Sequence, residues 1–82
     1  MTQKDLITIT VKFFADLTKY GPSKEEIHLS ENTSINSLLD KYQIPKEKIK
    51  LIILVNGIPH HNRDYVFKNG DIIALFPPLA GG

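Results

Sequence analysis

The sequence predicts an α+β fold, with one main helix packed across a mixed sheet. Residues 6–14 alternate apolar and polar side chains with the period of a strand. Residues 35–42 repeat apolar side chains at helical spacing, and residues 51–55 form an unbroken apolar run. The expected order is strand, short helix, strand, helix, strand, short strand and strand.

The first strand is predicted over residues 6–14, where β-branched residues dominate. One face of this strand holds the apolar side chains of Ile7, Ile9, Val11 and Phe13. Phe14 breaks the alternation, because it places a large apolar side chain on the polar face. Residues 15–20 are expected to form a short helical turn that Gly21 and Pro22 end.

The next two elements are a strand over residues 25–29, expected at a sheet edge, and the main helix. Three residues can cap the start of the helix with a side-chain oxygen, namely Asn32, Thr33 and Ser34. Its buried stripe is predicted to contain Ile35, Leu38, Leu39 and Tyr42. Pro45 should end the helix at or before Ile44, because the residue before a proline avoids helical backbone angles.

Residues 51–55 are predicted to form a central strand covered on both sides, because the apolar run is continuous. Asn56 and Gly57 follow as a strong hairpin signal. The return strand near residues 58–60 should be short, since Pro59 has no N–H for a sheet ladder.

The final part of the predicted domain is a polar loop over residues 61–71 followed by the last strand over residues 72–76. Residues 68–71 have the composition of a second turn. The apolar side chains able to anchor the loop are those of Tyr65, Val66 and Phe67.

Composition excludes several classes of function. The 82 residues suffice for one modest core, and the net charge of +1 argues against a protein that binds nucleic acid by neutralising phosphates. The chain has no cysteine, so neither a thiolate metal site nor a thiol nucleophile can form. No signal peptide or membrane-spanning run is evident, so we expect no membrane association and a cytoplasmic location.

Histidines are the remaining candidates for a metal site. His60 and His61 are adjacent, and neighbouring residues of a strand point to opposite faces. His28 lies elsewhere in the sequence, and no carboxylate has useful ligand spacing. We therefore expect no metal site. No acid/base pair, phosphate loop or nucleophile motif is present either, so the isolated chain is not expected to be an enzyme.

The last six residues differ in composition from the rest. We predict a folded domain over residues 1–76 and an extended tail over residues 77–82. Pro77 and Pro78 cannot extend a sheet and favour polyproline II, so the chain should leave the domain as a stiff arm. Gly81 and Gly82 have no β-carbons and could enter a slot too narrow for other residues.

These features together resemble the MoaD/ThiS family of ubiquitin-like sulfur carriers, which have the β-grasp fold. The matching segments are the early VKFFADL, the LVNG hairpin, the NGDIIALFPP run and the terminal GG, and they span essentially the whole chain. The FPPLAGG segment most resembles the small subunit of molybdopterin synthase.

This resemblance implies that an E1-like enzyme uses ATP to adenylate the carboxylate of Gly82, which then becomes a thiocarboxylate that donates sulfur. The chain itself would hold no stable cofactor. A large synthase subunit would accept the tail in its active site, within a heterotetramer that makes the dithiolene of the molybdenum cofactor. The residues that thread into the partners would be Gly81, Ala80, Leu79, Pro78 and Pro77.

A partner-binding patch is expected at the root of this tail. Phe14 and Phe76 are aromatic residues at strand ends, where the chain leaves the sheet, and with Ile58 or Pro59 they could form an apolar surface. The alternative is that both phenylalanines simply complete the core. The family resemblance favours the patch, because the equivalent residues dock on both partners.

Other functions remain open on the sequence alone. Related carriers serve the thiazole pathway of thiamine or the thiolation of tRNA, and others are conjugated to protein lysines. A plain interaction module, whose tail is never activated, is the competing class.

Overall fold

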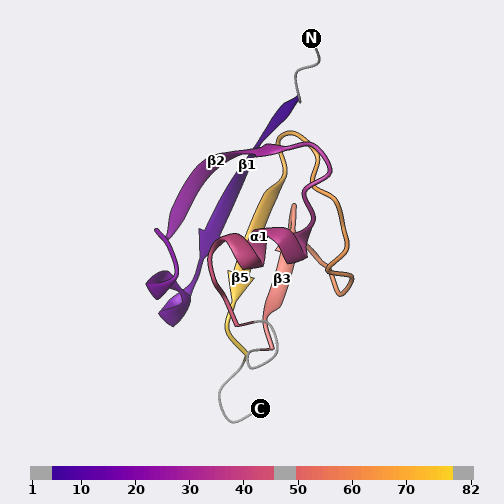
Figure 1. Ribbon diagram of the computed structural model, residues 1–82. Helices are drawn as coiled ribbons and strands as arrows, with labels where there is room; N and C mark the ends of the chain where they lie inside the picture. Colours follow the sequence, from indigo (N-terminus) through magenta and orange to yellow (C-terminus); the bar gives the residue numbers. More distant parts are fainter. Residues whose placement is uncertain (1–4, 46–49, 79–82) are drawn as a thin grey trace.

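The computed structural model describes residues 5–45 and 50–78, and the predictions for residues 1–4, 46–49 and 79–82 lie outside this part of the chain. The described residues form five strands, one α-helix and a short 3-10 helix, η1, and Figure 1 shows how they are arranged. The elements in chain order are β1 (Leu6–Phe13), η1 (Ala15–Lys19), β2 (Lys24–Ser30), α1 (Ile35–Lys41), β3 (Ile52–Val55), β4 (Ile58–Pro59) and β5 (Ile72–Phe76).

The strands form one sheet in the order β2-β1-β5-β3-β4. The central pair, β1 and β5, is parallel, and the other neighbouring strands are antiparallel. The sheet is therefore mixed, β2 lies at its edge as predicted, and the topology agrees with the β-grasp fold that the resemblance implies.

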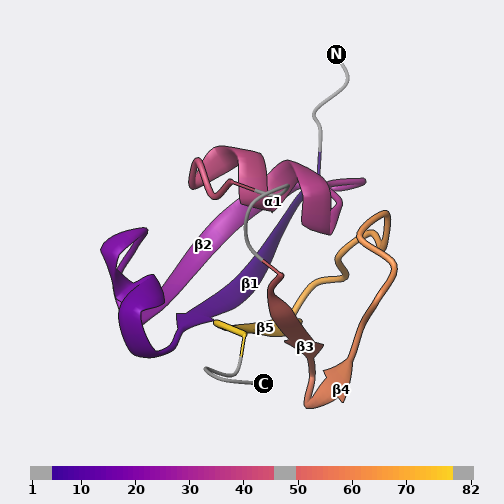
Figure 2. The same cartoon turned by 90° about the horizontal axis from the view of Figure 1, so that it is seen from below.

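The core lies between the sheet and α1. Figure 2 shows α1 on one side of the sheet, while the other side has no helix packed on it among the described residues. Alternate residues of β1 point toward α1, in agreement with the predicted period. The side chains buried there from strands and helix include Ile9, Val11, Phe13, Ile35, Leu38, Leu39, Ile73 and Leu75.

Hydrogen bonds define both ends of α1. At the start, the Ser34 hydroxyl oxygen accepts a hydrogen bond from the backbone N–H of Ser37 at 3.2 Å. At the end, Gln43 adopts a positive φ of 59°, and the N–H of Ile44 donates to the carbonyl of Leu39 at 3.0 Å. This wrapped C-terminus is a Schellman motif, and it stops the helix before Pro45.

The hairpin between β3 and β4 turns at Asn56 and Gly57, whose φ angles are +53° and +82°. Two consecutive positive φ angles define the type I′ turn that Asn-Gly favours, so this prediction is confirmed. The return strand contains only Ile58 and Pro59, as short as the proline requires.

The loop after β4 packs against the start of α1. The Phe67 side chain is buried, and its N–H donates to the carbonyl of Thr33 at 3.0 Å. Tyr65 is half-buried and its carbonyl accepts from the N–H of Ile35. Val66 has an exposed side chain and contributes through a backbone bridge to Ser34. Tyr65 and Phe67 therefore anchor this loop by their side chains.

The prediction that β3 is covered on both sides is wrong. Ile53 and Val55 point into the core, whereas 40% of the Ile52 surface is exposed and Leu54 is half-buried. In residues 5–45 and 50–78 a single layer covers the sheet, so the apolar residues on the second face of β3 line an open surface. Among the described residues, no helix is long and apolar enough to cross a membrane, and no three metal-ligating side chains gather.

Candidate functional site: an apolar groove at the root of the C-terminal arm

The site begins where the sheet ends. The last rung of the β3–β5 ladder pairs Ile52 with Phe76, and Pro77 follows without an N–H to continue it. On the other side of β5, the N–H of Phe14 donates to the carbonyl of Leu75 at 3.1 Å. The parallel pairing of β1 with β5 therefore brings Phe14 beside Phe76, although 62 positions separate them in the sequence.

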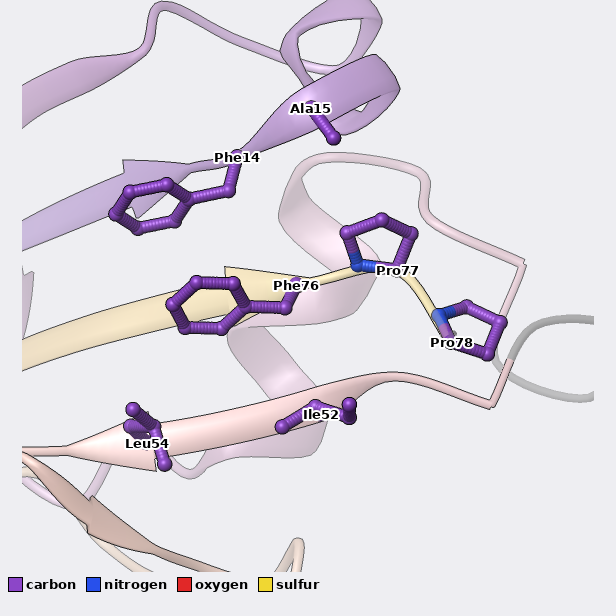
Figure 3. A pocket seen from close by; sticks show the side chains of 7 residues that line it. All are labelled: Phe14, Ala15, Ile52, Leu54, Phe76, Pro77 and Pro78. Carbon is purple, nitrogen blue, oxygen red and sulfur yellow. The ribbon is translucent and has the colours of Figure 1, made fainter. Parts of the chain in front are cut away.

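The two phenylalanine rings stack on the open face of the sheet. Their centroids lie 4.3 Å apart and their planes differ by 8°. Figure 3 shows the rings side by side, with Ile52 and Leu54 on the neighbouring strand. Of the Phe14 surface, 39% is exposed, which confirms the prediction that this residue does not belong to the core. Each ring shields one face of the other from water while leaving apolar surface accessible.

These rings form part of an apolar groove with a volume of about 730 Å³. The groove continues along the start of the arm, where Pro77 and Pro78 lead away from β5 (Figure 3). Its lining consists of Phe14, Ala15, Ile52, Leu54, Phe76, Pro77 and Pro78. No lining side chain can donate or accept a hydrogen bond or coordinate a metal, so no side chain of the groove can orient a small polar ligand. It suits the apolar side chains of a protein partner.

The structure brings together only part of the predicted patch. Pro59 pairs with Leu54 and therefore lies on the groove face, but it does not line the groove. Ile58 pairs with Val55, whose side chain points to the core side, so Ile58 belongs to the opposite face although 62% of it is exposed.

Sequence reasoning missed Ala15, Ile52 and Leu54. The signal for Ile52 and Leu54 was present, because alternate residues of an apolar strand must share a face. The unbroken run from 51 to 55 concealed it by suggesting burial on both sides. Ala15 has no such signal, since its place depends on the turn from β1 into η1.

A polar cluster beneath the hairpin fixes the start of β5, the strand that leads into the arm. The Asp71 carboxylate is buried and accepts hydrogen bonds from the Asn56 amide at 2.9 Å, the Tyr65 hydroxyl at 2.8 Å and the Lys68 backbone N–H at 2.8 Å. The side-chain oxygen Oδ1 of Asn56 in turn accepts a hydrogen bond from the backbone N–H of Ile72 at 3.0 Å. One cluster thus joins the β3–β4 turn, the loop and β5.

This arrangement sets the ionisation of both acidic groups. Burial alone would raise the pKa of the Asp71 carboxyl, but the hydrogen bonds from Lys68, Asn56 and Tyr65 outweigh it and hold the pKa below its ordinary value. Burial, followed by the hydrogen bond to Asp71, raises the pKa of the Tyr65 hydroxyl. Tyr65 therefore stays protonated and Asp71 stays charged near neutral pH, so both hold their roles as donor and acceptor.

The remaining predicted site residues, Leu79, Ala80, Gly81 and Gly82, lie outside the described residues. Their proposed roles stay predictions.

Comparison with known families identifies the chain. The family model described as the ThiS family matches residues 11–82, which includes β1 from Val11, the groove residues, and Gly81 and Gly82. The chain belongs to the ThiS family. Members of this family are small ubiquitin-like sulfur carriers, and the β-grasp sheet with one helix is their fold. No curated protein matches this ThiS-family chain.

Several solved structures are similar to this ThiS-family chain. A putative molybdopterin converting factor subunit 1 from Pyrococcus furiosus is 26% identical, with a TM-score of 0.73 over 89% of this chain and 99% of that one. A complex of subunits 1 and 2 of molybdopterin-converting factor from Helicobacter pylori includes a chain that is 28% identical, with a TM-score of 0.58 over 93% and 100%. Small archaeal modifier protein 1 from Methanosarcina acetivorans is 25% identical, with a TM-score of 0.64 over 95% and 99%.

Proposed function

We propose that this chain carries sulfur as a thiocarboxylate on Gly82 and donates it in the synthesis of molybdopterin. The observation that supports this most is the family match, which includes Gly81 and Gly82 as well as the folded domain. The arm that begins at Pro77 would hold these glycines away from the sheet, at most about 20 Å from its edge.

The chemistry resides on the main chain. The carboxylate of Gly82 attacks the α-phosphorus of ATP in an E1-like partner and releases pyrophosphate, giving an acyl adenylate. A sulfur nucleophile at the oxidation level of sulfide then attacks the carbonyl carbon and expels AMP, leaving a thiocarboxylate. This chain supplies no side-chain catalyst, which agrees with the absence of cysteine and with a groove whose lining side chains are all apolar.

We choose molybdopterin as the product because this chain is similar to solved structures of molybdopterin-converting factor subunit 1. Two of the structures reported above are named as subunit 1 of molybdopterin-converting factor, and one of them is bound to a subunit 2. We propose that a corresponding large subunit accepts the arm of this chain and takes up the sulfur. The groove at the root of the arm would then contact that subunit while Gly82 occupies its active site.

A second candidate function is conjugation to proteins. Small archaeal modifier protein 1 of Methanosarcina acetivorans is nearly as similar in sequence as the molybdopterin proteins. A modifier would use the same activated carboxylate but would transfer the acyl group to a lysine amine. Both functions need Gly82 activated, whereas a plain interaction module would not.

The proposal is tested by two changes in the arm. Deletion of Gly82 should abolish the pyrophosphate exchange that the cognate adenylating enzyme catalyses with the parent chain. Gly81→Ala should lower the rate strongly, because the added methyl group meets the walls of a narrow channel. Neither change should lower the melting temperature, since both lie beyond the last core strand.

The pathway is then resolved by adding the thiocarboxylate form to the large subunit and the pterin precursor. Formation of the dithiolene supports the molybdopterin role. No dithiolene here, together with isopeptide-linked products when the unmodified chain is incubated with the adenylating enzyme, ATP and a lysine-containing acceptor protein, would favour the modifier. Exchange that persists in the Gly82 deletion would refute the carrier role itself.

A further inference from the structure

Two lysines face each other on the open side of the sheet. Lys12 of β1 pairs directly with Lys24 of β2. The next pair along the two strands is Phe13 with Ser23, and the N–H of Phe13 donates a hydrogen bond to the carbonyl of Ser23 at 3.0 Å. Hydrogen-bonded and non-hydrogen-bonded pairs alternate along antiparallel strands, so Lys12 and Lys24 form a non-hydrogen-bonded pair. In such pairs the side chains approach most closely.

This juxtaposition is unfavourable for the isolated fold. Like charges directly opposite each other in a sheet are destabilising. Glu26 follows Lys24 on the same face but pairs with Thr10, and it forms no ion pair with either lysine in the part of the chain that the structure describes. Lys12 is half-buried and Lys24 is exposed, so the two ammonium groups add positive charge to this face without stabilising it.

The lysine pair is continuous with the apolar groove. Lys12 pairs with Ala74 of β5 on its other side, and Ala74 pairs with Leu54, which lines the groove. Phe14 follows Lys12 by two residues and lies on the same face. One surface therefore combines an apolar half, over β5 and β3, with the pair Lys12 and Lys24 at its border, over the end of β1 and the start of β2.

We propose that this surface docks the adenylating enzyme through an apolar side chain that enters the groove and carboxylates that reach Lys12 and Lys24. This inference rests on the proposed function and adds the chemical character of the partner. Charge complementarity supports it, because two uncompensated cations beside an apolar groove favour an acidic border on the protein that covers them. The same arrangement explains why a destabilising pair is present, since residues that serve binding are often unfavourable for folding.

The test uses Lys12→Gln and Lys24→Gln, which remove one charge each and keep most of the side-chain stem. Lys41→Gln is the matched control, because Lys41 is exposed at the end of α1 on the other side of the sheet. Affinity of each full-length chain for the purified cognate adenylating enzyme is measured by calorimetry, together with its melting temperature.

Each of the two test variants should bind about fivefold more weakly than the parent, the loss expected for one partly exposed ion pair. Their melting temperatures should rise by about 1–4 °C, because the repulsion between the lysines is relieved. Raising the salt concentration from about 0.1 M to about 1 M should weaken the parent and the control, and should bring them close to the two variants.

Equal affinity of the parent and both test variants at low salt would overturn the inference, as would a loss of melting temperature without a loss of affinity. An affinity loss that the Lys41→Gln control shares would overturn it too, because net charge alone would then be responsible. The proposed function fails separately, if the enzyme does not bind or adenylate the parent chain at all.

Discussion

At the scale of single residues, Asp71 shows how one buried charge organises the end of the fold that leads to the arm. Its carboxylate accepts hydrogen bonds from Asn56 and Tyr65 side chains and from the Lys68 backbone. A buried carboxylate is stable only when such donors compensate for its lost hydration. The sequence suggested a turn residue at Asp71, but not a connection to the β3–β4 hairpin, because that contact depends on the tertiary fold.

The ionisation of Asp71 predicts how stability changes with pH. The pKa of Asp71 in the folded chain is below the value of about 3.9 for an unperturbed aspartate. The carboxylate therefore gives its full stabilisation of the fold at any pH well above that value. As pH falls further, the unfolded chain binds the proton first and stability decreases until the folded pKa is passed. Asp71→Asn should cost about 2 kcal/mol of unfolding free energy at pH 7. It should also make the acid-induced loss of stability shallower than in the parent, as measured by urea denaturation; an equally steep loss would contradict this.

Phe14 and Phe13 are adjacent in the sequence and offer a matched comparison of groove and core. Phe14→Ala should cost no more than about 1.5 kcal/mol of stability, because the side chain is already 39% exposed and its ring stacks on Phe76 at an open face. It should weaken binding of the large subunit about thirtyfold, as expected for an aromatic residue central to an interface. Phe13→Ala, which empties a buried site, should cost about 3–5 kcal/mol of unfolding free energy. A comparable loss of stability in both variants would place Phe14 in the core and remove the argument for the groove.

At the scale of secondary structure, the end of α1 contains a residue in an unfavourable conformation. Gln43 has a φ of +59°, a left-handed conformation that side chains with a β-carbon rarely adopt, and it is exposed. Glycine is the usual residue at this position of a Schellman motif. Gln43→Gly should therefore stabilise the fold by about 0.5–1 kcal/mol, which a shift in the urea midpoint would show. A destabilised variant would mean that the Gln43 side chain contributes a contact that outweighs the backbone strain.

The strands show what sequence patterns can and cannot establish at this scale. The alternation in β1 and the Asn-Gly turn have local causes, and both were predicted correctly. A strand was predicted over residues 51–55 and is found at Ile52–Val55, but its environment was predicted wrongly, because an apolar residue can face either a core or an open groove. The position of α1, which covers one face of the sheet in the described part of the chain, decides between the two for Ile52 and Leu54.

At the scale of the whole molecule, the sequence predicted the fold class and the position of the groove better than it predicted which residues line the groove. Phe14 was out of phase with its strand and Phe76 preceded two prolines, so both could be assigned to the root of the arm. Ile58 was placed there too, but its pairing with Val55 turns it to the other face. The pairing of Lys12 with Lys24 could not be predicted from the sequence, because it depends on the register between β1 and β2.

The central claim is that Gly82 is converted to a thiocarboxylate, and intact mass spectrometry tests it most directly. The purified chain is incubated with the cognate adenylating enzyme, ATP and a sulfide source, and a parallel sample omits ATP. We expect the mass to increase by the difference between one sulfur and one oxygen atom only with ATP, and fragmentation should place the change on Gly82. An unchanged mass while the enzyme adenylates another known carrier, or a sulfur atom placed on any other residue, would show that Gly82 is not the sulfur-carrying residue.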